Sequence, residues 1–274
     1  MGSVAIITGG ASGIGAALAS RLARDGAEVW IADHQLDEAT TLAERLGARA
    51  HAIELDVRDA AAFERVVGEV VDRSGRIDYL FNNAGIGVSG EVDSYALADW
   101  TDVFDVNLLG VVHGIQAAYP VMIRQRSGHI VNTASMAGLM TSGGQTSYSA
   151  TKHAVVAISR SLRVEADRHG VRVSVVCPGV IRTPILTGGK YGRFTREPGL
   201  SDEEFVKRVW EPLRPLDVDV FAQRVFRRVL RNDAIIIVPA WWKAFWYLER
   251  LSPALSLKFA AFALTRSREV QAFG

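Results

Sequence analysis

The first 240 residues alternate short apolar runs with segments of helical periodicity. The apolar runs have the length of strands and fall at about 3–7, 28–32, 49–55, 79–81, 128–134, 171–177 and 234–238. Helical patterns fall between them at about 16–25, 36–46, 60–74, 99–125, 148–169 and 218–231. Strands joined by helices lie parallel in one sheet that helices cover on both faces. We therefore predict an α/β fold: a doubly wound, mainly parallel seven-stranded sheet in a single domain, residues 1–240.

Two regions depart from this alternation. Residues 184–216 are rich in glycine, proline and charge, and they carry an amphipathic stretch at about 202–210. Long irregular insertions in compact domains are usually functional, so we expect a lid over a substrate there. Residues 241–274 are apolar and rich in aromatic side chains. We expect them to form a C-terminal helical extension.

The C-terminal tail is not expected to span a membrane. Its apolar stretch is interrupted by Lys243, Glu249, Arg250, Pro253 and Lys258, whereas a spanning helix needs about 20 consecutive apolar residues. Two interpretations stay open. The aromatic side chains pack on the substrate pocket or on a partner subunit, or they dip into a membrane surface with lysine and arginine at the headgroups.

A glycine-rich turn follows the first predicted strand. Its spacing, Gly9-x-x-x-Gly13-x-Gly15, differs from the commoner G-x-G-x-x-G. Glycines permit positive φ and let a diphosphate approach the bare N–H groups at a helix N-terminus. Because the turn lies between a strand and a helix, we predict a dinucleotide site. The candidate contacts are Gly9, Ser12, Gly13, Ile14 and Gly15.

Acidic residues end the second and third predicted strands. Asp33 lies 18 residues after Gly15, near the distance at which a carboxylate can accept hydrogen bonds from an adenosine ribose diol and would repel a 2′-phosphate. It favours NAD over NADP as the cofactor; the alternative is an aspartate that merely opens a loop. Asp56 and Val57 could hold the adenine edge with a carboxylate and a backbone amide.

Polar and small residues follow two later strands. Asn83, Ala84 and Gly85 can brace the sheet and let a cofactor pass close to the backbone. The turn at Pro178 and Gly179 redirects the chain over the same site, and the Thr183 hydroxyl could reach a carboxamide or a phosphate there. Because the carboxyl ends of parallel strands meet at one edge of a sheet, we expect these residues to converge.

Tyr148 and Lys152 are four residues apart in a helical pattern, so they lie on one face. An adjacent ammonium favours the phenolate, which predicts a Tyr148 pKa below the usual ~10 and a general acid/base. Ser135 follows an apolar run, at a strand end where open α/β sheets keep their chemistry. Taken alone, the Tyr-Lys spacing is a weak signal, because such a pair more often lies on an ordinary helix surface than in a site. Asn107, on an apolar helix face, is either a polar brace or a site residue.

Together these residues resemble the short-chain dehydrogenase/reductase family over about residues 1–240. The shared motifs, in order, are Thr8-Gly9-x-x-x-Gly13-x-Gly15, Asn82-Asn83-Ala84-Gly85, Asn107, Ser135, Tyr148-x-x-x-Lys152 and Pro178-Gly179. The resemblance implies a Rossmann-type fold and an NAD-preferring oxidoreductase. It also implies a homodimer or homotetramer assembled through the helices at about 100–125 and 148–169. The tail beyond residue 240 lies outside the shared pattern.

The resemblance also implies a role for each catalytic residue. Tyr148 would be the acid/base, and Lys152 would bind the nicotinamide ribose while favouring the phenolate. Ser135 would orient the substrate oxygen. Asn107 would hold a water that links Lys152 to solvent. The implied reaction is hydride transfer between NAD and a secondary alcohol or ketone.

Apolar residues surround the predicted site. They are Met136 to Met140 after Ser135, Val180 and Ile181 after the Pro-Gly turn, and Ile185 and Leu186 at the start of the lid. If they line the pocket, they suit a lipophilic alcohol or ketone, such as a steroid, terpenoid, aryl or medium-chain compound, rather than a sugar or hydroxy acid. The same residues are also compatible with a core.

Composition disfavours several other classes of protein. The 31 Lys+Arg and 30 Asp+Glu residues create no general field that would attract nucleic acid. The six histidines show no ligand spacing and Cys177 is the single cysteine, so a metal site is not expected. Two alternatives remain: the same chemistry with NADP, or a nucleotide-binding regulatory protein without turnover, which would not need Ser135, Tyr148 and Lys152.

The sequence also predicts a cellular location, the cytoplasm. A lone buried cysteine fits a reducing, cytoplasmic compartment. The first strand begins within two residues of Met1, so we expect no signal peptide. Association of the tail with a membrane is the alternative to a purely cytoplasmic protein.

Overall fold

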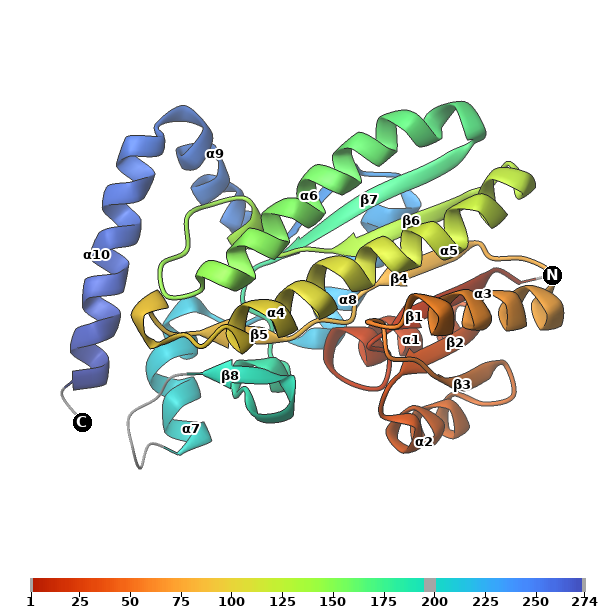
Figure 1. The fold of residues 1–274 in the computed structure, drawn as a ribbon, viewed down its shortest axis with the longest axis horizontal. Helices are drawn as coiled ribbons and strands as arrows, with labels where there is room; N and C mark the ends of the chain where they lie inside the picture. Colours follow the sequence, from red (N-terminus) through yellow and green to blue (C-terminus); the bar gives the residue numbers. More distant parts are fainter. Residues whose placement is uncertain (1, 195–200, 273–274) are drawn as a thin grey trace.

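The structure is a computed structural model that describes residues 2–194 and 201–272 (Figure 1). Residues 195–200 of the predicted lid and 273–274 of the predicted tail therefore lie outside the described residues.

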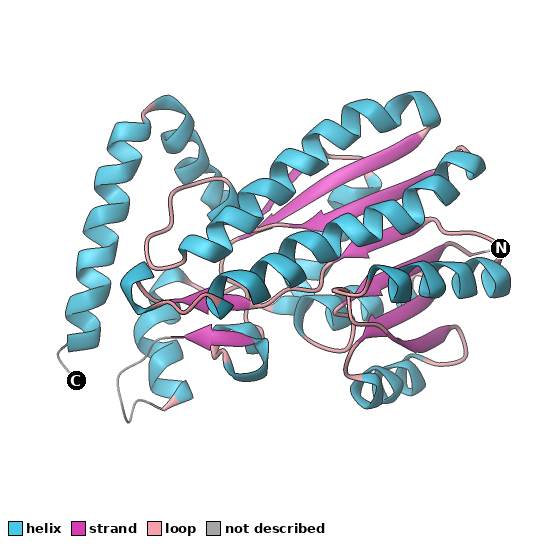
Figure 2. Ribbon diagram, viewed as in Figure 1, coloured by secondary structure: helices cyan, strands magenta, loops and turns pink. Residues whose placement is uncertain are grey.

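Seven parallel strands form the central sheet (Figure 2). They are β1 (Val4–Thr8), β2 (Glu28–Asp33), β3 (Ala50–Glu54), β4 (Tyr79–Asn82), β6 (Gly128–Thr133), β7 (Val171–Pro178) and β9 (Ile235–Val238). Their order across the sheet is β3-β2-β1-β4-β6-β7-β9, and every neighbouring pair is parallel. This confirms the predicted doubly wound, parallel seven-stranded sheet.

Helices cover both faces because successive strand residues point to opposite sides of the sheet. Ile6 and its like-facing neighbours pack with α3 (Ala60–Ser74), α5 (Gly110–Gln125) and α6 (Thr146–Ala166). Ile7 and its neighbours pack with α1 (Gly13–Arg24), α2 (Leu36–Leu46) and α8 (Val218–Leu230). The core is therefore two apolar layers, one on each side of the sheet (Figure 1).

The predicted helix at 99–125 is one continuous helical rod with an irregular turn inside it. It consists of α4 (Ala98–Phe104), the π-helical turn η2 (Asp105–Leu109) and α5. Among the described residues it is the one helix long and apolar enough to cross a membrane. However, Val111, Ile115 and Met122 are buried against the sheet, as in the core helix of a globular domain.

The insertion before α8 contains short elements that the sequence analysis did not resolve. β8 (Gly192–Phe194) pairs in parallel with β5 (Gly87–Ser89) in a separate two-stranded sheet. The other elements of the insertion are the 3-10 turns η5 (Pro184–Leu186), η6 (Gly189–Tyr191) and η8 (Glu211–Leu213), with α7 (Asp202–Phe205) and its π-helical continuation η7 (Val206–Trp210). Further 3-10 turns lie outside the insertion: η1 (Val92–Ser94), η3 (Met136–Gly138) and η4 (Asp167–His169). The amphipathic stretch noted at about 202–210 is helical.

The C-terminal tail is a helical hairpin at one end of the molecule. A 3-10 turn, η9 (Ala240–Trp242), leads into α9 (Lys243–Leu251), which turns back through Ser252 into α10 (Pro253–Ala272). Figure 1 shows α10 standing beside the domain rather than over its sheet. This confirms the predicted helical extension.

The strand order creates a crevice at the carboxyl ends of β1 and β4. After β1 the chain moves to β2 and β3 on one side, and it then returns to β4 on the other side of β1. Loops that leave neighbouring strands in opposite directions open a space between them, and ligands bind there in open α/β sheets.

Candidate active site

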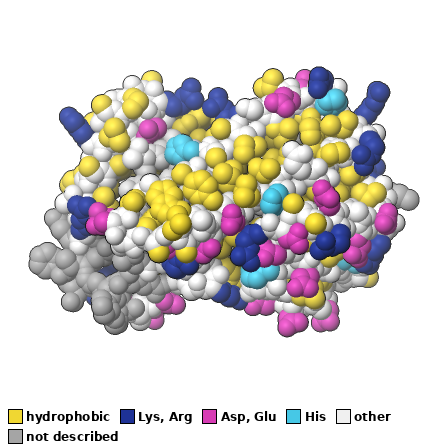
Figure 3. Space-filling model, in the orientation of Figure 1, with side chains coloured by type: hydrophobic (Ala, Val, Ile, Leu, Met, Phe, Trp, Pro, Cys, Tyr) yellow, Lys and Arg dark blue, Asp and Glu magenta, His cyan; other side chains and the backbone are white. Residues whose placement is uncertain are grey.

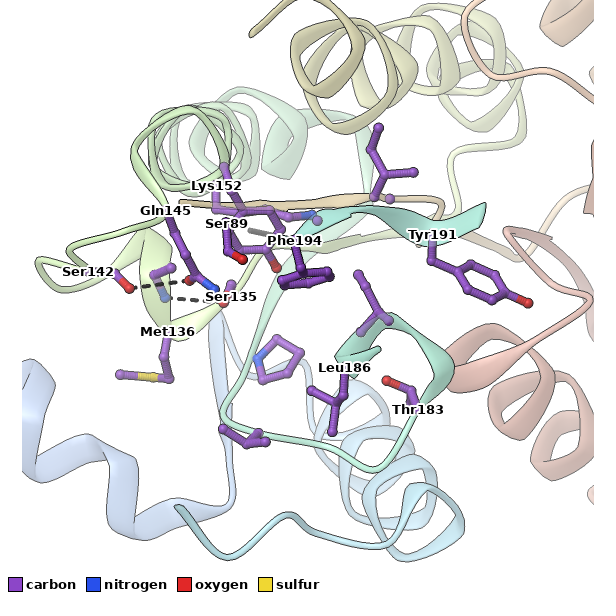
Figure 4. A pocket seen from close by; sticks show the side chains of 18 of the residues that line it. Ser89, Ser135, Met136, Ser142, Gln145, Lys152, Thr183, Leu186, Tyr191 and Phe194 are labelled. Carbon is purple, nitrogen blue, oxygen red and sulfur yellow. Dashed lines mark hydrogen bonds between the residues drawn. The ribbon is translucent and has the colours of Figure 1, made fainter. Parts of the chain in front are cut away.

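One large cavity, of about 1170 Å³, lies at this crevice. It extends from Asp33 at the end of β2, past Tyr148 and Lys152 on α6, to Phe259 on α10. Sites for single small molecules occupy roughly 300–1,000 Å³. The cavity therefore has room for a dinucleotide and a substrate side by side, and Figure 4 shows its central part.

The predicted glycine turn forms the floor of the cavity at its nucleotide end. Gly9 and Gly13 have φ values of +61° and +52°, the left-handed region that disfavours other residues. A Cβ at Gly15 would lie 2.0 Å from the Gly9 carbonyl oxygen. Thr183 packs over the turn, because a Cβ at Gly13 would meet its side chain at 3.4 Å. The turn and Thr183 thus share one wall, as predicted, and Ser12 and Ile14 line the cavity with them.

We predict that Gly15→Ala weakens NAD binding by at least about tenfold. The added methyl group must displace the Gly9 carbonyl, or the Asn83 amide 2.9 Å away, and so distort the turn. Gly68→Ala, within α3, is the matched control, because a Cβ there meets nothing within 4 Å. Titration of protein fluorescence with NAD measures both variants. Equal NAD affinity in Gly15→Ala and the control would contradict the assignment of the turn.

Thr8 ties the turn after β1 to the turn after β4. Its hydroxyl oxygen accepts hydrogen bonds from the backbone N–H groups of Asn83 (3.0 Å) and Ala84 (3.1 Å). The Asn83 side-chain amide donates to the Thr8 carbonyl oxygen (3.1 Å). Asn83 is thus the brace that the sequence predicted. Thr8 was missed as its partner, although a threonine directly before the glycine turn is a usable signal.

Asp33 is buried in the cavity wall, only 3% exposed. Its two carboxylate oxygens accept hydrogen bonds from the backbone N–H groups of Ala11 and Gln35, each at 3.0 Å. These bonds fix a negative charge at the nucleotide end of the cavity. They also tie the end of β2 to the glycine turn.

Asp56 and Val57, in the loop after β3, line the cavity as Asp33 does. The Asp56 carboxylate pairs with Arg58 at 2.6 Å, and this pairing lowers the pKa of Asp56. The Val57 carbonyl is 2.9 Å from Nδ1 of His113. Both residues lie where the adenine was predicted, and their contact with it stays a prediction.

Ser135, Tyr148 and Lys152 all line the cavity, and Figure 4 shows Ser135 and Lys152 within it. Ser135 follows β6 in extended backbone, and its hydroxyl oxygen accepts a hydrogen bond from the Ala137 N–H at 3.1 Å. Tyr148 lies in the first turn of α6, and Lys152 lies one turn later. The strand end and the helix thus bring a hydroxyl, a phenol and an ammonium to one place, as predicted.

Lys152 is almost fully buried, at 3% exposed. Its Nζ donates a hydrogen bond to the Thr133 carbonyl (2.9 Å) and lies 5.5 Å from the Tyr148 ring centre. Burial lowers the pKa of Lys152 to about 8. A Cβ at Gly85 would lie 3.5 Å from this Nζ, so the glycine after β4 leaves room for the lysine.

The predicted lowering of the Tyr148 pKa is wrong in direction. Burial raises the pKa of Tyr148 above its usual value, and a hydrogen bond with Ser135 opposes that rise only in part. An ionised phenol in an apolar wall loses its hydration, and this cost exceeds the benefit of the hydrogen bond. Tyr148 therefore carries its proton at neutral pH.

Asn107 is fully buried in η2, and its side chain is bound to one residue. The amide oxygen accepts from the Ile86 N–H (2.8 Å), and the amide nitrogen donates to the Ile86 carbonyl (2.9 Å). This pair braces the loop after β4, which agrees with the simpler of the two interpretations. The water-holding role stays a prediction.

The Pro178-Gly179 turn is held between β9 and the C-terminal tail. The Gly179 N–H donates to the Val238 carbonyl at 2.9 Å. A Cβ at Gly179 would lie 2.2 Å from Nε1 of Trp242, so only glycine lets this indole pack against the turn. Both turn residues line the cavity. The contact between Gly179 and Trp242 was not predicted.

The other end of the cavity is mainly apolar. Of the apolar residues named from the sequence, Met136, Ala137, Met140, Val180, Ile181, Ile185 and Leu186 line it. Gly138 and Leu139 do not line it but are buried in the core behind it. The sequence analysis did not name Phe194, Trp210 or Leu264, which the insertion and α10 bring to this end from distant positions in the chain.

Cys177 lies in β7 behind the catalytic group and is fully buried. Burial raises the pKa of its thiol to about 12. The thiol is therefore protonated at neutral pH and does not act as a nucleophile. The predicted buried position is confirmed.

Comparison with known proteins gives a consistent result. A family model described as short chain dehydrogenase matches residues 3–190. Levodione reductase of Leifsonia aquatica is 37% identical over 210 residues, which cover 74% of this chain and 79% of that enzyme. Meso-2,3-butanediol dehydrogenase of Serratia marcescens is 38% identical over 186 residues, covering 68% and 74%. A short chain dehydrogenase/reductase from Burkholderia phymatum in complex with NAD is structurally similar, with a TM-score of 0.83, 30% identity and coverage of 93% and 95%.

Proposed function

The chain belongs to the short-chain dehydrogenase/reductase family, and we propose that it transfers a hydride between NAD and a lipophilic secondary alcohol or ketone. The observation that carries the proposal is the convergence of Ser135, Tyr148 and Lys152 in one cavity with the glycine turn after β1. A phenol, a hydroxyl and a buried cation beside a nucleotide-binding turn suit proton transfer at a substrate oxygen.

The residues at the nucleotide end fit a dinucleotide. The glycine turn leaves bare backbone at the N-terminus of α1, where a diphosphate gains from free N–H groups and the helix dipole. Gly85 leaves room for the Lys152 ammonium, which lies 3.5 Å from where a Cβ at this glycine would be, and both Gly85 and Gly179 line the cavity. Bound NAD would supply the hydride chemistry. The protein positions the substrate and handles its proton.

Three side chains would each have a separate role at the substrate oxygen. Ser135 donates a hydrogen bond that orients it. Tyr148, protonated at neutral pH because burial raises its pKa, gives its proton to the oxygen during ketone reduction and accepts one during alcohol oxidation. Lys152 is mainly protonated below about pH 8 and supplies a positive charge beside the phenol. In this arrangement, alcohol oxidation speeds up as the pH rises.

NAD is preferred to NADP because of the charge at the nucleotide end. A 2′-phosphate near β2 would meet the buried Asp33 carboxylate. Two cations also line this region, but both are already paired. Arg58 binds Asp56 at 2.6 Å, and Lys190 binds Glu38 at 2.6 Å.

We expect Asp33→Ala to weaken NAD binding by about 10- to 100-fold and to narrow the preference over NADP, because it removes charge-assisted hydrogen bonds to the ribose. Asp33→Asn is the matched control, since it can keep an acceptor for the Ala11 N–H while removing the charge. Fluorescence titrations with NAD and NADP measure both variants. An NAD affinity unchanged in both would remove Asp33 from the site.

The substrate proposal rests on the apolar end of the cavity. Met136, Ile185 and Leu186 from the domain line the cavity together with Phe259 and Leu264 from α10. Such a lining suits a steroid, terpenoid, aryl or medium-chain compound more than a sugar. The relatives named above act on levodione and on 2,3-butanediol, by their names.

Absorbance at the reduced-nicotinamide band tests the proposal as a whole. Purified protein is assayed with NAD and with NADP against lipophilic and polar secondary alcohols, and in reverse with the matching ketones. Turnover with NAD and lipophilic alcohols supports the proposal, and turnover with NADP alone would support the runner-up cofactor. Tight NAD binding without turnover on any substrate would favour a regulatory, nucleotide-binding role.

The proposal includes a homodimer or homotetramer in the cytoplasm. Figure 3 shows hydrophobic side chains gathered in a band over α4, α5 and α6. Leu109 is 42% exposed and Val164 is 80% exposed, and a contiguous apolar surface of this kind marks an interface. Light scattering of the purified protein measures the assembly.

A further inference from the structure

The α9–α10 hairpin is attached to the domain by one face only. Trp242 packs on Gly179, and Leu264 packs on Gly143. The Glu249 carboxylate accepts hydrogen bonds from the Thr141 N–H (3.2 Å) and from the Ser256 hydroxyl (2.5 Å). Near the end of α10, Arg268 donates to the Glu91 carboxylate at 2.7 Å. These contacts hold the hairpin against the cavity, and they occupy only its inner side.

The opposite face of the hairpin is apolar and open to solvent. We call it the outer face and define it by the exposed residues Trp241, Tyr247, Leu251, Leu255 and Phe262. Tyr247 and Leu251 lie one turn apart on α9, and Leu255 and Phe262 lie two turns apart on α10, so each pair shares one side of its helix. Leu251 is 84% exposed and Phe262 is 64% exposed. An exposed apolar surface of this composition is normally covered by a partner or a membrane.

The charges of the outer face distinguish between a protein partner and a membrane as the group that covers it. Arg250 and Lys258 are exposed among its apolar residues, and neither has a carboxylate partner within the described residues. Glu249 is the one acidic residue in the described stretch 241–265, and its half-buried carboxylate is bound by Thr141 and Ser256. The exposed side chains of this stretch therefore include no carboxylate. A symmetric contact with a second copy would bring this cationic face onto itself without a countercharge. An anionic surface would complement it.

We propose that the outer face of the α9–α10 hairpin binds an anionic lipid surface. The two helices lie in the plane of the headgroups, with Leu251, Leu255 and Phe262 in the acyl boundary and Arg250 and Lys258 at the phosphates. Trp241 and Tyr247 suit the same depth, since indole and phenol rings prefer the membrane interface.

This location connects the membrane with the cavity. Phe259, Ala260, Ala263 and Leu264 of α10 line the cavity, and Phe259 lies within one turn of the outer-face residues Leu255 and Phe262. A substrate dissolved in the lipid would then enter the cavity beside α10 without crossing water. This second step rests on the proposed function, whereas lipid binding itself does not.

Co-sedimentation of the full-length protein with vesicles tests the proposal. One vesicle preparation is phosphatidylcholine alone, and the other contains phosphatidylglycerol as well. We expect binding to the anionic vesicles at least about tenfold tighter than to the neutral ones, and weaker as salt is added. Absence of binding to the anionic vesicles, or equal binding to both, would overturn the proposal.

Two sets of variants make the test specific. Arg250→Glu with Lys258→Glu, and separately Leu255→Ser with Phe262→Ser, should each reduce anionic-vesicle binding by about tenfold or more. The matched control is Val220→Ser with Leu230→Ser, two residues of α8 that are 37% and 53% exposed and belong neither to the outer face nor to the band over α4, α5 and α6. This control should bind the vesicles as the wild type does.

Two further measurements distinguish lipid binding from contact with a second copy, and from a failure of the proposed reaction. If the Leu255 and Phe262 variant becomes a smaller oligomer by light scattering while its vesicle binding is unchanged, a second copy covers the face and the proposal is overturned. NAD-linked turnover of a water-soluble alcohol, measured without vesicles, should be the same in all these variants and the wild type. Vesicle binding without any turnover would contradict the proposed reaction and leave the lipid-binding claim standing.

Discussion

Tyr148→Phe should lower turnover by about 10²- to 10⁴-fold while NAD affinity stays within about twofold of the wild type. The substitution removes only the hydroxyl that exchanges a proton with the substrate oxygen. The ring that packs 5.5 Å from the Lys152 ammonium is kept. Because burial raises the pKa of Tyr148, the wild-type phenol is a proton donor at neutral pH, and phenylalanine has nothing to donate.

The control for this variant is Tyr119→Phe on α5. Burial also raises the pKa of Tyr119, but its side chain does not line the cavity. Turnover should therefore match the wild type in the control. Turnover in Tyr148→Phe within tenfold of the wild type, with the control normal, would show that another group handles the proton.

Lys152→Met should abolish most turnover and yet make the protein more stable at pH 7. Burial lowers the pKa of Lys152 from the ordinary value of 10.5 to about 8, which corresponds to a cost of roughly 3 kcal/mol for burying the charged ammonium. Methionine has a similar length without the charge, but it leaves the Thr133 carbonyl without its donor, which costs about 1–3 kcal/mol. We expect a net gain of about 1 kcal/mol in the free energy of unfolding.

The pH dependence identifies the cause of that gain. The folded-state pKa of Lys152 is lower than its unfolded value, so between about pH 8 and 10.5 the unfolded chain binds the proton and the folded protein does not. The free energy of unfolding of the wild type therefore rises with pH across this window because of Lys152. The stability advantage of Lys152→Met over the wild type shrinks over the same pH range.

Urea unfolding of the wild type and Lys152→Met at both ends of that window measures the effect. Lys190→Met is the matched control, because Lys190 is exposed and its pair with Glu38 is a surface ion pair of small value. A stability difference between Lys152→Met and the wild type that does not change with pH would contradict the burial cost of the lysine.

The sheet was predictable because its signal is local. Each of the seven strands is an apolar run that ends in glycine, proline or a polar residue, and the helices between them carry their own periodicity. The pairing of β5 with β8 was not predictable. Each strand has three residues, and Gly87 and Gly192 meet only because the insertion folds back over the cavity.

The site residues were predictable in position but not in electrostatics. Strand ends placed Gly9, Asp33 and Ser135, and helical spacing placed Tyr148 beside Lys152. The pKa of Tyr148 was misjudged because it depends on burial by segments far away in the chain. The lysine likewise donates to Thr133, a carbonyl that no spacing rule identifies.

The secondary structure of the C-terminal tail was predictable, but its contacts were not. Its composition predicted helices and left two interpretations open, a pocket wall and a membrane contact. The structure places its inner side on the cavity through Trp242 and Phe259. Spacing could not reveal that Trp242 packs on Gly179, because that contact joins the loops that follow β7 and β9, two strands that are far apart in the sequence and adjacent in the sheet.

The most direct test of the central claim follows the hydrogen itself. The wild type is mixed with NAD and a lipophilic secondary alcohol that carries deuterium on its carbinol carbon, and the reduced cofactor is analysed by mass spectrometry. We predict that one deuterium appears in the reduced cofactor with the wild type and none with Tyr148→Phe over the same time. Ketone formation without deuterium in the cofactor, by a protein that binds NAD, would contradict hydride transfer at this site.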